Sequence, residues 1–273
     1  MLSPSRALSL HAESGRPLPR VPAFADLYNQ LGWNPRHGEV IMVAGRSKSQ
    51  KSGFALYWVE QMGLPALYFS ADMSAFTASA RLASMATGET TEDVEAGMKH
   101  GRADYYLEAL ARSKIQFAFG SPITWRRVEE ELEAYVELWN AYPAVIVLDN
   151  LMDFEDAQSD YAEQMAVMSE VTEMARYTES TVIVMHHATD KSKAAEWLPH
   201  LPPSVQDIKN GLGEKAECTL GVALDPSDLS FNVAVLLQRM GPSDRSGNTY
   251  RKLRCEPETT RFHQYRSQYL RGA

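Results

Sequence analysis

The stretch VIMVAGRSKSQKSGFAL, residues 40–56, decides which fold this chain of 273 residues adopts. Its first six residues are apolar and predict a buried strand, and KSGFAL predicts the start of a helix. The loop between them reads G-x-x-x-x-Q-K-S, which differs at one position from the phosphate-binding pattern G-x-x-x-x-G-K-[ST]. In that pattern, successive backbone N–H groups and the helix N-terminus bind phosphate oxygens. The stretch therefore predicts a strand, a phosphate loop and a helix.

The residue types in this loop suit a nucleoside triphosphate. Lys51 would neutralise β- and γ-phosphate oxygens, and Ser52 would hold Mg²⁺. Gln50 stands where glycine lets the backbone take unusual torsion angles. Either Gln50 has ordinary torsion angles and points outward, or the loop is strained; Gly53 lies on the helix and does not obviously replace the missing glycine. The alternative is a Ser/Lys-rich surface turn that matches by chance. The residues expected to bind nucleotide are Gly45, Arg46, Ser47, Lys48, Ser49, Gln50, Lys51 and Ser52.

The rest of the chain alternates apolar runs with helical patterns. The apolar runs lack a clean polar alternation, so we expect strands buried on both faces of a mostly parallel central sheet flanked by helices. After residue 217, closely spaced strands with short turns predict an antiparallel extension at the C-terminal end, and residues 188–215 read as a long polar loop. The expected strands are 40–45, 66–71, 114–120, 144–150 and 181–187, and the expected helices are 51–61, 76–85, 91–111, 125–140 and 161–179.

Composition limits the class of protein. With 44% hydrophobic residues the chain suits one α/β domain, expected over residues 22–273 after a flexible tail of residues 1–21. The net charge of −8 argues against a protein that coats duplex DNA, so nucleic acid would need a local basic site. Cys218 and Cys255 lack the spacing of a zinc site or disulfide scaffold, which favours a reducing cytoplasm. No apolar run has the length of a membrane span or signal peptide.

Two aspartates follow expected strands. In an open α/β sheet, ligands bind at the carboxyl ends of the strands. Asp149 ends the run AVIVLD and is the carboxylate expected on the Mg²⁺ side of a nucleotide. Asp72 follows ALYFSA and could activate an attacking water. The alternative is that each aspartate caps a following helix.

The order of these motifs resembles the RecA-like ATPase domain of DnaB-type replicative helicases and their small phage relatives. The resemblance runs from about Phe24 to Phe262 and rests on an ordered set of motifs, none of which matches in full. They are GRSKSQKS (45–52), SADMS (70–74), RLASMATG (81–88), VIVLDNLMDF (145–154), MHHA (185–188), QDIKNGLGEKAE (206–217) and LQRMGPSDRSG (237–247). The resemblance implies a P-loop NTPase with ATP and Mg²⁺.

The resemblance also implies roles for single residues. Asp72 takes the place of the family's catalytic Glu, and His187 the place of a Gln that senses the γ-phosphate. Arg239 takes the place of an arginine finger that reaches the neighbouring subunit's nucleotide, which implies a homo-oligomer: a ring, such as a hexamer, or a filament. Leu237 stands where the family has Lys. These departures, with Gln50, concern the activity more than the fold.

Single-stranded DNA is the partner that the resemblance implies. Lys191, Lys193 and Lys209 lie in the long loop that lines the family's central channel, where a few lysines from each subunit could hold the DNA backbone. A solvated loop with scattered charge is the alternative. His186 and His187 are neighbours on an expected strand and point to opposite faces, so they do not easily share a metal ion.

Three functions follow from this reading. The first is an ATP-dependent helicase or translocase motor of DNA replication or recombination, in the cytoplasm of a bacterium or phage-infected host, with replication proteins as partners. The second is a non-motor single-strand annealing or recombination mediator. The third is a degenerate nucleotide-binding adaptor or loader for a helicase, which Gln50 favours because it can reduce turnover. Lys51, Asp149 and Arg239 argue against it, because an inactive site has no need of all three.

Overall fold

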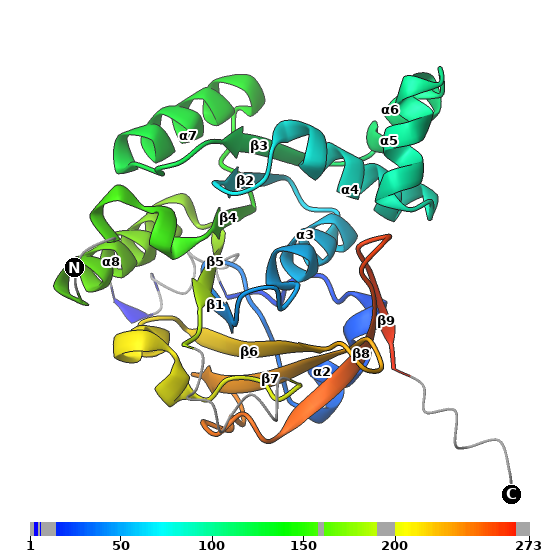
Figure 1. The fold of residues 1–273 in the computed structure, drawn as a ribbon. Coiled ribbons are helices and arrows are strands. Elements are labelled where there is room, and N and C mark those ends of the chain that lie inside the picture. The colour runs from blue at the N-terminus through cyan, green and yellow to red at the C-terminus, as the bar shows by residue number, and fades with distance from the viewer. Residues whose placement is uncertain (1–2, 5, 7–14, 158–160, 190–199, 266–273) are drawn as a thin grey trace, which may run out of the picture.

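The computed structural model describes residues 3–4, 6, 15–157, 161–189 and 200–265 (Figure 1). These residues form a nine-stranded sheet with the strand order β3-β2-β4-β5-β1-β6-β7-β8-β9. The strands are β1 (Val40–Gly45), β2 (Ala66–Ser70), β3 (Ile115–Phe119), β4 (Val145–Asp149), β5 (Thr181–His187), β6 (Cys218–Asp225), β7 (Ser230–Gln238), β8 (Tyr250–Glu256) and β9 (Arg261–Gln264). The first six are parallel and the last three join antiparallel.

Helices cover both faces of this sheet (Figure 1). The α-helices are α2 (Ala25–Gln30), α3 (Lys51–Met62), α4 (Ala75–Thr87), α5 (Thr91–Lys99), α6 (Ala103–Leu110), α7 (Trp125–Trp139) and α8 (Tyr161–Thr178). The 3₁₀ helices are η1 (Pro22–Phe24), η2 (Leu151–Asp153), η3 (Glu155–Ala157), η5 (Val205–Asp207) and η6 (Lys209–Glu214). The expected α/β class, with its antiparallel C-terminal strands, is confirmed.

The apolar strands divide their side chains between two cores. In β1, Ile41 and Val43 pack on the α3 side of the sheet, whereas Met42 and Ala44 pack on the side of α7 and α8. Strand β4 alternates in the same way. Because successive strand residues face opposite sides, a strand covered on both sides needs an unbroken apolar run. This is why the strands carry no polar alternation.

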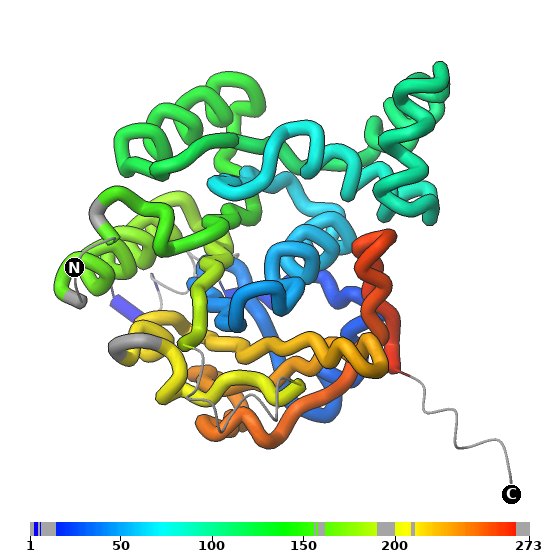
Figure 2. The backbone as a smooth tube through the Cα atoms, in the orientation of Figure 1, coloured from blue at the N-terminus to red at the C-terminus, as the bar shows by residue number. Residues whose placement is uncertain are grey.

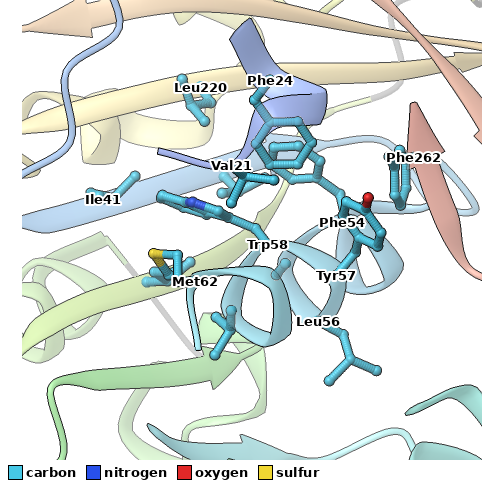
Figure 3. Close-up of a cluster of buried hydrophobic side chains, with 14 of the residues drawn as sticks. Val21, Phe24, Ile41, Phe54, Leu56, Tyr57, Trp58, Met62, Leu220 and Phe262 are labelled. Atoms are coloured by element: carbon cyan, nitrogen blue, oxygen red, sulfur yellow. The ribbon is translucent and has the colours of Figure 1, made fainter. Parts of the chain in front are cut away.

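Aromatic residues distant in sequence fill the core beside α3 (Figure 3). Phe54 of α3 lies with its ring centroid 5.0 Å from that of Phe24 and 5.8 Å from that of Phe262. The smooth trace shows how β9, at the end of the described chain, returns to lie against α3 (Figure 2). The helix that follows the phosphate loop is thus held by both ends of the domain.

Three boundaries differ from the expectation. The expected helix over 91–111 is two helices, because Gly101 takes a left-handed φ of +82° between α5 and α6. The long loop 188–215 contains η5 and η6 among its described residues. Leu18 and Val21, assigned to the flexible tail and to the first residues of the domain, are both buried in the core, because the chain there bridges to Arg36 through Pro17. No described helix is long and apolar enough to cross a membrane.

Candidate nucleotide site

The carboxyl ends of the central strands bring the expected site residues to one edge of the sheet. Gly45, the last residue of β1, pairs with His187 at the end of β5. Ser70, the last residue of β2, pairs with Asp149 at the end of β4. Since β4 and β5 are also neighbours, four strands end together where the phosphate loop leaves β1. This is the edge at which open α/β sheets bind ligands.

The loop from Gly45 to Lys51 joins β1 to α3 tightly. A Cβ on Gly45 would lie 2.5 Å from Ser49 Oγ and 2.9 Å from Val222 Cγ2, so the first position of the motif has room only for glycine. The Ser49 hydroxyl is buried and has no hydrogen-bond partner among the described residues. Helix α3 begins at Lys51, where the N–H of Phe54 donates to the carbonyl of Gln50. The expected strand, loop and helix are therefore all present.

Gln50 adopts the strained one of its two expected conformations. Its φ is 63° and its ψ is 20°, which is the left-handed region that glycine reaches without a steric penalty. Gln50 Oε1 lies 3.1 Å from the point where a Cβ on Gly53 would be. Gly53 does not replace the missing glycine, but the space it leaves free is where the Gln50 side chain lies. This use of Gly53 was not evident in the sequence.

Lys51 and His187 meet across the loop. Lys51 is 7% exposed, and its Nζ lies 3.2 Å from Nδ1 of His187. Burial lowers the pKa of Lys51, while the nearby charges of Asp149, Asp72 and Asp153 act in the opposite direction. A buried ammonium group amid carboxylates is a strong site for an anion with which it can exchange contacts. The neighbouring His186 is fully buried on the other side of β5, as the strand periodicity predicts.

Asp149 is buried and accepts hydrogen bonds from two hydroxyl groups. Tyr68, on β2, donates to Asp149 Oδ2 over 2.8 Å, and Ser52 also bonds this carboxylate. Burial raises the pKa of Asp149, and these two donors and Lys51 oppose the rise. Tyr68 was missed by the sequence reasoning, although a tyrosine two residues before the polar end of a buried strand was an available signal.

A second acidic group, Asp153, joins the two expected aspartates. Asp72 is exposed beyond the end of β2, and its charge acts on Lys51 and Asp149. Burial raises the pKa of Asp153, with Asp72 and Asp149 adding to the rise. The Asp153 carboxylate also accepts the N–H of Asn150 and so caps η2. Capping therefore belongs to Asp153, whereas Ser74 caps the helix after Asp72.

Arg239 lies at the opposite edge of the sheet. It follows β7, whose Gln238 pairs with Cys218, and Cys218 in turn lies beside Ile41 at the start of β1. The four residues from there to Gly45 span roughly 13 Å. Arg239 is exposed, and its Nη2 lies 3.4 Å from Oε1 of Glu217. The structure thus does not bring Arg239 to the phosphate loop of its own chain.

A half-buried carboxyl group accompanies Arg239. Burial raises the pKa of Glu39 to about 7, and the charge of Glu217 adds to the rise. Neither glutamate was expected as a functional residue. Of the lysines expected to contact DNA, Lys191 and Lys193 lie outside the described residues. Lys209 begins η6, and its side chain is also outside the description.

Two phage proteins are similar to this chain along most of their length. The Gene 65 protein of Mycobacterium phage L5 is 28% identical over 275 residues, which cover 97% of this chain and 99% of the phage protein. The Gene 65 protein of Mycobacterium phage D29 is 29% identical over 238 residues, 83% of this chain and 99% of that protein. No protein-family model matches the sequence.

Solved structures show the same fold at lower identity. A DnaB-like replicative helicase, studied with its interactions with primase, superposes with a TM-score of 0.77 at 15% identity, over 97% of this chain and 69% of that one. A separately solved ATPase domain gives 0.76 at 16% identity, over 96% of both chains. The RadB recombinase gives 0.57 at 18% identity, over 89% of this chain and 97% of that one. The chain therefore has the RecA-like fold of DnaB-like ATPase domains, which confirms the resemblance.

Proposed function

We propose that this chain is a P-loop ATPase of the DnaB-like helicase type, which works as an oligomer on single-stranded DNA. The observation that carries the proposal is the convergence of Lys51, Ser52, Asp149 and His187 at the carboxyl edge of the sheet, around a loop that leads into a helix N-terminus. A buried cation, a hydroxyl–carboxylate pair and the backbone N–H groups of a helix N-terminus together suit a triphosphate with its metal. The RecA-like fold supports the same class.

In this proposal Lys51 exchanges its contact with His187 for phosphate oxygens, and the imidazole then senses whether a γ-phosphate is present. The Ser49 hydroxyl supplies a further donor for an arriving oxygen. Ser52 and Asp149 would hold Mg²⁺, since a hydroxyl and a carboxylate are oxygen ligands that this ion accepts. When bound, the ion neutralises charge on the phosphates. Asp72, exposed beside the loop, orients and deprotonates the attacking water.

Oligomerisation follows from the position of Arg239. An exposed arginine at the opposite edge can complete only the site of another subunit, so the proposed finger acts between subunits of a ring or filament. Lys191, Lys193 and Lys209 are proposed to hold the DNA backbone. The proposed setting is the cytoplasm of a bacterium or phage-infected host, with replication proteins as partners.

The direct test is ATP hydrolysis with and without single-stranded DNA, over protein concentrations that allow assembly. Lys51→Ala should lower turnover by about 100-fold or more, because it removes a charge aimed at the phosphates. Lys99→Ala is the matched control, since Lys99 is exposed at the end of α5. Turnover no higher than that of Lys51→Ala at every concentration would overturn the ATPase proposal.

Two other functions keep a specific observation in their favour. The left-handed Gln50 favours an adaptor that binds nucleotide without turning it over. The likeness to the RadB recombinase fold favours an annealing or recombination mediator. Nucleotide binding without hydrolysis would identify the adaptor. DNA-stimulated hydrolysis with annealing of complementary strands, but no strand displacement, would identify the mediator.

A further inference from the structure

A groove runs between α7 and α8 on the face of the sheet opposite α3 (Figure 1). Its volume is about 800 Å³, and its apolar floor includes Val128 and Leu132 of α7 and Met174 of α8. These three side chains belong to the core on that face and are 1%, 7% and 9% exposed. None of the groove's residues takes part in the proposed nucleotide site, so what binds here is a separate question.

Both sides of the groove carry negative charge. Glu129, Glu133 and Glu137 lie four residues apart along α7, and Glu170 and Glu173 lie on α8. All five are exposed. The described residues that line the groove include no lysine, arginine or histidine. The arginines of α7 are placed elsewhere on the helix, where Arg126 lies 3.6 Å from Glu130 and Arg127 lies 3.9 Å from Glu131.

One end of the groove carries exposed tyrosines. Tyr177 is 78% exposed and Tyr142 is 37% exposed, and their ring centroids are 5.9 Å apart in an edge-on arrangement. Aromatic residues at the edge of an apolar depression are typical of protein interfaces. Nucleic acid and anionic lipid would be repelled by the glutamates. The groove therefore suits a ligand that is apolar on one side and positively charged at its edges.

We propose that the α7–α8 groove binds a basic amphipathic helix of a partner protein. The line from Glu129 to Glu137 is about 12 Å long, which matches rather more than two helical turns. Apolar side chains at positions i, i+3 or i+4, and i+7 of such a helix would lie on the floor, and flanking lysines or arginines would reach the glutamates on either side. The charged contacts remain near solvent, so they contribute mainly to specificity and association rate, and the apolar floor contributes most of the affinity.

The test measures binding of labelled synthetic peptides by fluorescence anisotropy. The probe is an amphipathic leucine–lysine helix of about 14 residues, roughly four turns. It is compared with a scrambled peptide of the same composition and with a leucine–glutamate version. We expect the probe to bind at least about 10-fold more tightly than either comparison peptide, and to weaken as salt rises from about 50 to about 500 mM, because salt screens exposed charges.

Variants of the protein locate the binding. The double substitution Glu133→Lys with Glu173→Lys should weaken probe binding about 10-fold or more, because it puts positive charge on both sides of the groove. Tyr177→Ala should weaken it several-fold, and because this side chain is mostly exposed the variant is expected to fold normally. The matched control is Glu130→Lys, which makes the same charge change on α7 outside the groove and should bind like the wild type.

Three results would overturn the proposal. One is equal binding of the probe and the scrambled peptide, which would show that no amphipathic helix is recognised. Another is unchanged probe binding in both the double variant and Tyr177→Ala. The third is a change of oligomeric state in the double variant, which would show that a second copy of this chain occupies the groove. ATPase activity enters none of these measurements, so failure of the proposed function would not affect them.

Discussion

Replacing Gln50 with glycine tests how the strained phosphate loop is held. The left-handed backbone at Gln50 costs about 1–2 kcal/mol for a residue with a Cβ. The change to glycine removes that cost but loosens the unfolded chain, which returns about 0.4–1 kcal/mol. Gln50→Gly should therefore raise the free energy of unfolding by up to about 1 kcal/mol. It should also tighten nucleotide binding, because the backbone can then approach the phosphates.

A double-mutant cycle with Gly53 locates the effect. Gly53→Ala gains up to about 1 kcal/mol of helix propensity. In the wild type its Cβ would lie 3.1 Å from Gln50 Oε1 and 3.2 Å from Thr260 Cγ2, and these close contacts oppose the gain. With Gln50→Gly the first contact disappears, so the alanine should be better tolerated. We expect a favourable coupling of about 0.5–1 kcal/mol between the two substitutions.

The assay is urea unfolding of the wild type, both single variants and the double variant, with nucleotide affinity measured in parallel. Thr260→Ser is a useful companion because it removes the second contact and leaves Gln50 in place. Additivity of the two substitutions within about 0.3 kcal/mol would refute the reasoning, because independent sites behave in that way. Destabilisation by Gln50→Gly would show that the side chain contributes more than its backbone conformation costs.

Three further predictions concern charged and hydrogen-bonded groups. Tyr68→Phe should lower stability by about 1–3 kcal/mol because it takes a donor from a buried carboxylate; since the pKa of Asp149 is already raised in the folded state and would rise further, unfolding curves should show a larger loss near pH 8 than near pH 5. Glu39 has a folded pKa of about 7 against an ordinary value of 4.5, so its stabilising effect is complete below the ordinary value and is lost as pH rises through 7; Glu39→Gln should be about 1–2 kcal/mol more stable than the wild type near pH 8.5, allowing for partial exposure, and similar near pH 5 in denaturant titrations. Arg239→Ala should bind nucleotide normally but lose turnover, and mixing it with Lys51→Ala should restore part of the activity, because mixed interfaces pair an intact loop with an intact finger; an inactive mixture that still assembles would contradict action between subunits.

The sequence by itself determined the fold class. Residues 40–45 and 145–149 are apolar with at most a polar last residue, and such runs are stable only where both faces of a strand are covered. The helices between them follow from periodicity, and the phosphate loop from a glycine, a lysine and a serine at the required spacing. These are local properties of the chain, so they can be read without knowing which segments meet.

The tertiary structure decided how the candidate site is completed. Strand register brings Tyr68 close to Asp149 and places Lys51 beside His187, and the sequence contains no signal of either pairing. The antiparallel return of β7 carries Arg239 to the far edge of the sheet. Gln50 takes a left-handed conformation because the strand and helix on either side constrain the loop, and the space beside Gly53 accommodates its side chain. Register, chain return and shared space depend on residues distant in sequence, which is why only the folded chain reveals them.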